Sequence, residues 1–137
     1  PVIMESTPQL KKQVQKGGYV LRSCDNAVIT LMASGSEVSL ALKACETLED
    51  LGIKTQVVSV PCLDLLLEQP KGYIKELCGK SAVLAIEASR GLEWYAVADE
   101  VIGMQSFGAS GKGEALFNRF NFNIDYIIAA AQKLIQN

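Results

Sequence analysis

The chain has 137 residues, of which 49% are hydrophobic and 20% charged, and its formal net charge is -2. This composition excludes an intrinsically disordered chain, and the small net charge provides no field to attract nucleic acid or an acidic membrane surface. At this length we expect one domain, which can bury about two-thirds of the surface that its unfolded chain exposes.

The N-terminal part of the chain is predicted to be a linker. Residues 5–16 contain Pro8 and three lysines and lack a strong apolar face, and Gly17-Gly18 follows as a hinge. The opening Pro1-Val2-Ile3-Met4 is typical of the tail of a strand. We therefore expect residues 1–16 to join this domain to a preceding one in a longer polypeptide.

Two strands are predicted next. Residues 19–22 alternate weakly between apolar and polar positions, and residues 27–33 form a continuous apolar run. Between them lies the turn-forming cluster Ser23-Cys24-Asp25-Asn26, which predicts a hairpin. We expect the first strand to lie antiparallel to the second.

The centre of the chain predicts alternating helices and strands. Apolar positions recur at helical spacing from residue 36 to residue 51, and Gly52 stands where a helix C-cap favours glycine. Residues 53–60 then read as a β-branched strand that Pro61 ends. The later elements are predicted as two helical pieces (63–68 and 70–77), a strand (81–87), an irregular and then helical segment (88–97), a short strand (101–104) and a final amphipathic helix (124–135).

This order predicts a three-layer α/β/α sandwich with a mixed, mostly parallel sheet of about five strands, the first of them antiparallel. Strands that are apolar throughout belong in a sheet that is covered on both faces. In such sheets ligands bind beyond the carboxyl ends of the parallel strands. Here those ends are residues 34–37, 61–64, 87–90 and 105–110.

Three residues at these strand ends are candidates for ligand or anion contact: Gly35, Ser36 and Glu87. Gly35 allows a sharp turn, Ser36 can cap the following helix, and exposed helical N–H groups can bind an anion. A plain capped turn needs the same residues. Glu87 closes an apolar strand and could act as an acid or base, or could instead cap a helix or pair with Arg90.

No catalytic or metal-binding residue is assigned. The chain has no histidine, and Cys24, Cys45, Cys62 and Cys78 form no Cys-x-x-Cys pair. We interpret the cysteines as reduced core thiols of a cytoplasmic protein. The glycine-rich residues 103–113 lack the spacing of a phosphate-binding loop. We expect neither a signal peptide nor a membrane span, because no basic region followed by a short apolar one opens the sequence and no run of about 18 apolar residues occurs in it. Alone, the chain is expected to catalyse nothing.

Several motifs in one order and spacing resemble the C-terminal domain of the transketolase family, over most of the chain from Gly17 onward. The resemblance is carried by Gly17-Gly18-Tyr19-Val20-Leu21, by residues 33–38 (Ala-Ser-Gly-Ser-Glu-Val), by residues 57–64 (Val-Val-Ser-Val-Pro-Cys-Leu-Asp), by Ile86-Glu87-Ala88, and by Gly103-Met104 with Ser106-Phe107-Gly108.

The resemblance implies a homodimeric enzyme of the pentose phosphate pathway that moves a two-carbon ketol unit from a ketose phosphate to an aldose phosphate. It implies thiamine diphosphate and Mg²⁺ as cofactors, bound by the other domains, of which the preceding one binds the pyrimidine ring. This chain would then have an assembly role and could have a regulatory one. Met4 stands where the family usually carries a phosphate-binding arginine, so no substrate residue is transferred to this chain.

The sequence leaves three alternatives open. The chain could be the same domain of a related thiamine enzyme, such as deoxyxylulose-phosphate synthase or the β-subunit of a 2-oxo-acid dehydrogenase, although the Gly-Gly-Tyr-Val-Leu opening favours transketolase. It could also be a free-standing module that binds a phosphate or nucleotide, or purely an interaction domain. Affinity of the isolated chain for small phosphates would separate the binding module from an assembly domain.

Overall fold

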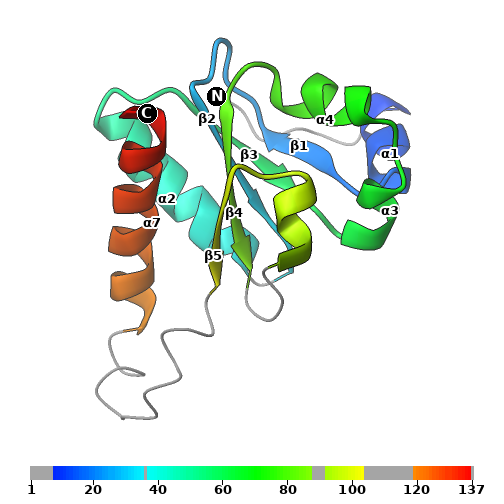
Figure 1. Ribbon diagram of the computed structural model, residues 1–137. Coiled ribbons are helices and arrows are strands. Elements are labelled where there is room, and N and C mark those ends of the chain that lie inside the picture. The colour runs from blue at the N-terminus through cyan, green and yellow to red at the C-terminus, as the bar shows by residue number, and fades with distance from the viewer. Residues whose placement is uncertain (1–7, 36, 88–91, 104–118, 137) are drawn as a thin grey trace.

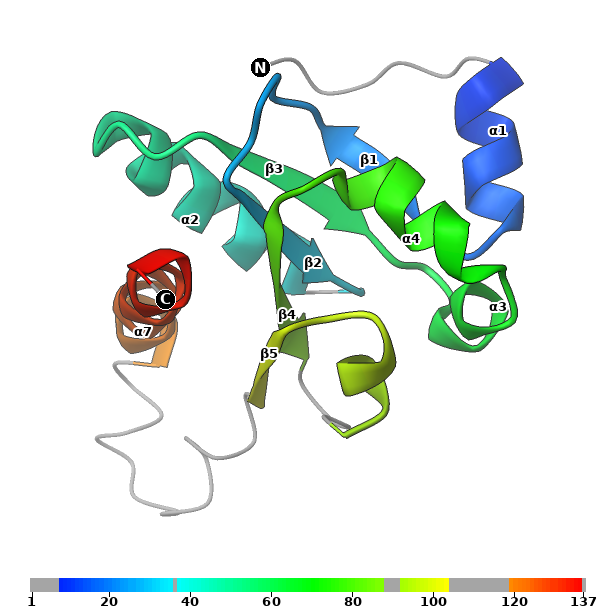
Figure 2. The same ribbon diagram turned by 45° about the horizontal axis from the view of Figure 1, so that its top comes forward.

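A five-stranded sheet lies between two layers of helices (Figures 1 and 2). The structure, a computed structural model, describes residues 8–35, 37–87, 92–103 and 119–136. Its elements are α1 (Pro8–Gln15), β1 (Tyr19–Arg22), β2 (Ile29–Ala33), α2 (Glu37–Asp50), β3 (Thr55–Ser59), α3 (Leu63–Leu67), α4 (Lys71–Cys78), β4 (Ala82–Glu87), the 3₁₀ helix η1 (Leu92–Ala96), β5 (Glu100–Gly103) and α7 (Arg119–Gln136).

The sheet has the strand order β1-β3-β2-β4-β5. Strand β1 is antiparallel to β3 and the other pairs are parallel, which confirms the predicted mixed sheet. The predicted hairpin between β1 and β2 is wrong, because β3 lies between them. Strand β3 pairs with β2 along its whole length, from Ile29↔Thr55 to Ala33↔Ser59, and β1 therefore pairs with the far side of β3.

The two central strands are buried on both faces. Every residue of β2 and of β3 is buried, as expected for parallel strands that helices cover on each side. Alternate side chains enter opposite layers. In β2, Leu31 points toward α2 and α7, whereas Met32 points toward α3, α4 and η1.

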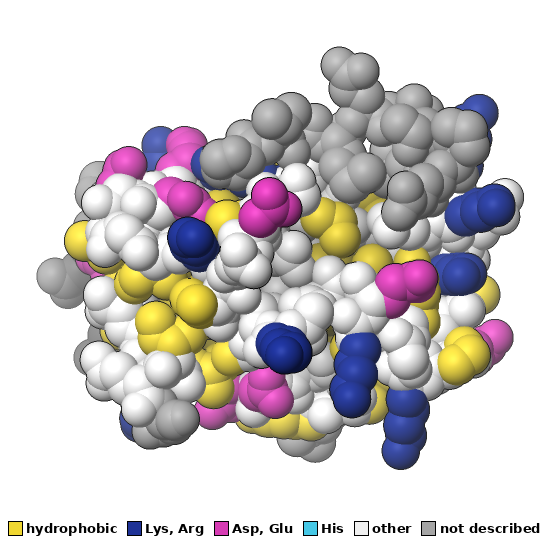
Figure 3. All heavy atoms as spheres, turned by 90° about the horizontal axis from the view of Figure 1, so that it is seen from above, with side chains coloured by type: hydrophobic (Ala, Val, Ile, Leu, Met, Phe, Trp, Pro, Cys, Tyr) yellow, Lys and Arg dark blue, Asp and Glu magenta, His cyan; other side chains and the backbone are white. Residues whose placement is uncertain are grey.

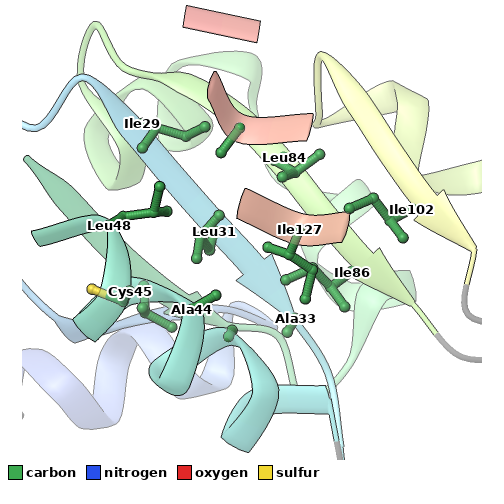
Figure 4. Packing of buried hydrophobic residues seen from close by; sticks show 13 residues of the cluster. Ile29, Leu31, Ala33, Ala44, Cys45, Leu48, Leu84, Ile86, Ile102 and Ile127 are labelled. Atoms are coloured by element: carbon green, nitrogen blue, oxygen red, sulfur yellow. The ribbon is translucent and has the colours of Figure 1, made fainter. Parts of the chain in front are cut away.

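The first layer consists of the long helices α2 and α7 and packs an aliphatic core (Figure 4). Its buried members from the helices are Ala41, Ala44, Cys45, Leu48, Ile127 and Ala131, and its members from the sheet are Ile29, Leu31, Ala33, Val57, Leu84, Ile86 and Ile102. Helix α7 begins five residues before the predicted start at residue 124.

The second layer consists of shorter helices that cover the opposite face (Figure 2). Its buried members are Met32, Val58, Val60, Leu66, Tyr73, Leu77, Cys78, Val83, Ala85, Trp94 and Ala98. No described helix of either layer is both long and apolar enough to cross a membrane.

The stretch expected as a linker contains helix α1, which packs beside β1 (Figure 1). Pro8 suits the first position of a helix, where no N–H group is needed, and glutamine and lysine are good helix formers. The side-chain oxygen Oε1 of Gln13 accepts a hydrogen bond of 3.2 Å from the backbone N–H of Val20 in β1. A side chain of helix α1 thereby satisfies a backbone hydrogen-bond donor of the edge strand β1.

The glycines expected to form a hinge are buried and closely packed instead. Gly17 has a φ of +97°, and a Cβ atom there would overlap the backbone nitrogen of Leu66 and lie 2.5 Å from the carbonyl oxygen of Cys62. The Tyr73 hydroxyl donates a hydrogen bond of 2.8 Å to the carbonyl oxygen of Gly18. The pair therefore fixes the second helical layer against the sheet.

Candidate functional site at the carboxyl ends of the strands

The turn between β2 and α2 is built on Gly35. This residue is exposed with a φ of +54°, and a Cβ atom there would meet nothing within 4 Å. The N–H of Glu37 donates to the carbonyl oxygen of Ser34 at 3.1 Å, and the N–H of Val38 donates to that of Gly35 at 3.3 Å. These bonds start the helical turn directly after the strand. Ser36, the predicted cap, lies outside the described residues.

Glu87 is brought together with Ser34 by the parallel pairing of β4 with β2. Because Ala33 is the partner of Ile86 in the register, the two following residues lie side by side. The Ser34 hydroxyl donates a hydrogen bond of 3.3 Å to Oε2 of Glu87. The indole Nε1 of the wholly buried Trp94 donates to the same oxygen at 2.7 Å. Glu87 therefore links β2, β4 and η1.

Two carboxylates flank the N-terminal end of α2. Glu37 lies in the first turn of the helix, where its charge interacts favourably with the positive end of the helix dipole. Glu87 adds a second acidic group beside the turn through Ser34. Because negative charge is already placed here, we expect the edge to suit a ligand that donates hydrogen bonds better than it suits a bare anion.

The end of β3, another predicted ligand-binding strand end, takes part in packing contacts. The segment after β3 contacts Gly17, whose carbonyl oxygen accepts a hydrogen bond of 3.3 Å from the N–H of Cys62. The segment after β3 therefore packs against Gly17 at the start of α3. Arg90 and residues 105–110 lie outside the described residues, as does Met4.

Three of the four thiols are in environments that favour the protonated form. Burial raises the pKa of Cys45 and of Cys78 to about 11. Burial, followed by the carboxylate of Glu49, raises the pKa of Cys24. Cys45 and Cys78 are buried core thiols as predicted, whereas Cys24 and Cys62 are half-buried; all four are free of disulfide bonds. Thiols held in the protonated form are poor nucleophiles at neutral pH.

The described residues do not fit a bound Mg²⁺ or a diphosphate held through one. Among them, no group of three or more His, Cys, Asp or Glu side chains could hold a metal ion. A divalent ion of this kind needs several oxygen ligands from carboxylates, carbonyls, phosphates or water. We therefore derive no chemical step through such a group on this chain.

Trp94 is the site residue that sequence reasoning did not identify as a partner of Glu87. The structure places Trp94 in the core, wholly buried. Its indole N–H needs an acceptor when buried, and a carboxylate at a neighbouring strand end is a suitable one. The sequence therefore predicts that a buried Trp94 needs a hydrogen-bond acceptor. It does not predict that Glu87 is that acceptor, because this depends on how the chain folds between residues 87 and 94.

The fold and the strand-end site define a class of protein, the open α/β domain with one antiparallel edge strand. In this domain the polar side chains at the strand ends bind one another. Comparisons identify the family. A family model described as the transketolase-like TK C-terminal domain matches residues 17–123. The chain belongs to the transketolase family and corresponds to its C-terminal domain.

Individual relatives agree with this assignment. The chain is 38% identical over 128 residues to a transketolase of Mycoplasma pneumoniae, covering 89% of this chain and 20% of the relative. It is 35% identical over 137 residues to transketolase 1 of Escherichia coli, covering 96% and 21%. A transketolase structure from Pichia stipitis in complex with sedoheptulose 7-phosphate superposes with a TM-score of 0.78 at 33% identity, covering 99% and 20%. The chain thus spans about a fifth of the length of these relatives.

Proposed function

We propose that this chain acts as the C-terminal domain of a transketolase, an enzyme of the pentose phosphate pathway that transfers a two-carbon ketol unit from a ketose phosphate to an aldose phosphate. The observation that supports this is the family match over residues 17–123, joined to a common fold over 99% of the chain. Because the chain spans about a fifth of its relatives, the activity is proposed for the whole enzyme.

Within that enzyme we assign this domain an assembly role. Thiamine diphosphate and Mg²⁺ would be bound by the other domains, with residues 1–16 connecting to the pyrimidine-binding one. The partners would be those domains, a second subunit and the sugar-phosphate substrates, in the cytoplasm.

The test compares the complete product of the gene with the 137-residue chain. Ketol transfer from xylulose 5-phosphate to ribose 5-phosphate would be measured with thiamine diphosphate and Mg²⁺ present. We expect turnover by the complete product and none by the chain alone. A complete product that binds the cofactor but transfers no ketol unit would favour a related thiamine enzyme. A gene that encodes only this chain would remove the enzyme assignment.

The strand-end edge is a second candidate function, as a ligand or regulatory site at Gly35, Ser36 and Glu87. The observation that favours it is the open space over Gly35 beside the first turn of α2. We would titrate the chain with ribose 5-phosphate and, in parallel, with inorganic phosphate. Saturable binding of the sugar phosphate that Glu87→Gln weakens would support the proposal. Absence of binding, or equal binding of phosphate alone, would contradict it.

A further inference from the structure

A polar hollow lies at the end of the sheet opposite to Gly35 and Glu87, where the parallel strands begin. It has a volume of about 320 Å³, and its polar lining includes Asn26, Gln56, Glu76 and Lys80. Figure 3 looks onto this end of the molecule, where basic and acidic side chains lie close together on the surface. Nothing in the proposed function uses this hollow.

A directional series of hydrogen bonds fixes the amide of Gln56. Its Nε2 donates to the carbonyl oxygen of Leu77 at 2.9 Å and to the Thr30 hydroxyl, also at 2.9 Å. The hydroxyls of Thr30 and Ser81 are 2.5 Å apart, and that of Ser81 donates to the carbonyl oxygen of Cys78 at 2.7 Å. Because the carbonyl oxygen of Leu77 can only accept, the nitrogen of the amide must face it.

This orientation leaves the Oε1 atom of Gln56 without a donor. Gln56 is only 8% exposed, and within the described part of the chain no group donates a hydrogen bond to Oε1. Buried polar atoms are nearly always satisfied, because an unmade hydrogen bond leaves the desolvation of the group uncompensated. Since both N–H groups are occupied and Gln56 lines the hollow, Oε1 is the amide atom left to accept a bond from its contents.

The rim adds one charge of each sign. Glu76 and Lys80 are exposed and both line the hollow. In the described part of the structure neither is in an ion pair, so both charges are available to a ligand. An occupant that carries an ammonium group and a carboxylate complements all three groups, because the ammonium can donate to Oε1 and to Glu76 while the carboxylate binds Lys80.

We propose that this hollow binds a small zwitterion of the α-amino acid class. The ammonium group lies against Gln56 and Glu76, and the carboxylate lies against Lys80. The volume is at the lower end of the range for small-molecule sites, which limits the occupant to a small amino acid. Exposure of both charged groups predicts weak binding, with a dissociation constant on the order of 1 mM.

The experiment is a nuclear magnetic resonance titration of the ¹⁵N-labelled chain with glycine, compared with acetate and with methylammonium. We expect saturable shifts at the side-chain amide of Gln56 and at the backbone of Gly79 and Lys80 with glycine. Shifts that stay linear in concentration, or that acetate or methylammonium reproduces at equal strength, overturn the proposal.

Matched variants distinguish specific binding of glycine in the hollow from a general effect of surface charge. Glu76→Ala and Lys80→Ala should each weaken glycine binding about fivefold, as expected for single exposed charged contacts. Lys75→Ala is the control, because Lys75 is an exposed lysine of α4, next to Glu76 in the chain, and does not line the hollow. Equal affinity in all three variants would contradict the assignment. A crystal grown with glycine that shows only water against Oε1 would also overturn it.

Discussion

The two helical layers of this domain are held to the sheet in different ways. Helices α2 and α7 have 14 and 18 residues and bury a continuous aliphatic surface. The described helices of the opposite layer have five to eight residues, and polar side chains tie them to the sheet, as Tyr73 does to Gly18 and Trp94 to Glu87. A short helix buries little apolar area, so its position depends more on specific hydrogen bonds and close contacts.

The largest effect should come from Gly17, where the short-helix layer meets the sheet. Gly17→Ala combines a positive φ with overlap against the backbone of α3, so we expect a loss of about 4 kcal/mol in unfolding free energy. Urea denaturation followed by circular dichroism measures it. Gly52→Ala is the control, because Gly52 has a φ of +83° with open space and should lose only about 1 kcal/mol. Equal losses would show that close packing is unimportant here.

The long-helix layer should respond to loss of volume. Leu48→Ala removes a wholly buried side chain of α2, and we expect a loss of about 3 kcal/mol from burial and the remaining cavity. Leu51→Ala, just beyond the same helix, is the control, because Leu51 is 55% exposed and should change stability by less than about 0.5 kcal/mol. If the two variants were equally stable by urea denaturation, aliphatic packing would not hold this layer.

The pH dependence of the unfolding free energy compares the two layers, because each layer contains one buried thiol: Cys45 in α2 and Cys78 in α4. Both have a pKa raised from 9.0 to about 11, so above pH 9 the unfolded chain loses these protons while the folded chain keeps them. Stability should therefore fall between pH 9 and 11, by on the order of 1 kcal/mol per pH unit for each thiol. Cys45→Ala and Cys78→Ala should each reduce this slope and leave the region from pH 6 to 8 flat. An unchanged slope in both variants would assign it to other groups.

The smallest effect should come from one hydrogen bond of the short-helix layer. Tyr73→Phe removes the donor to the carbonyl oxygen of Gly18 but keeps the ring beneath the ammonium of Lys16, so we expect a loss of about 1 kcal/mol. Tyr95→Phe is the control, because its exposed hydroxyl binds Glu100 at the surface and should contribute little. A loss that is no larger for Tyr73→Phe would contradict the role of polar ties in this layer.

Most of the fold could be predicted because the informative signals are local. The apolar runs of β2 and β4 indicate strands covered on two faces, and Gly52 and Pro61 mark ends that the structure reproduces within a few residues. The pairing of β1 could not be predicted in this way. A turn at residues 23–26 shows that the chain reverses, but which strand takes the position next to β2 depends on the later crossover through α2.

Helix α1 and the polar contacts show the same limit. Residues 8–15 have only a weak apolar face, and the contact of Gln13 with β1 that supports the helix is invisible in local sequence. The strand-end rule did bring Ser34 and Glu87 together, because it follows from the parallel register alone. The partners Trp94 and Gln56 were missed, because both depend on where distant segments pack.

Trp94 also gives this domain a built-in optical probe. It is the single tryptophan of the chain, so all indole emission comes from one buried ring whose N–H group binds the carboxylate of Glu87. Fluorescence intensity and wavelength will therefore report directly on the carboxyl end of β4. A small molecule or a neighbouring domain that engages Glu87 should change this emission without any added label.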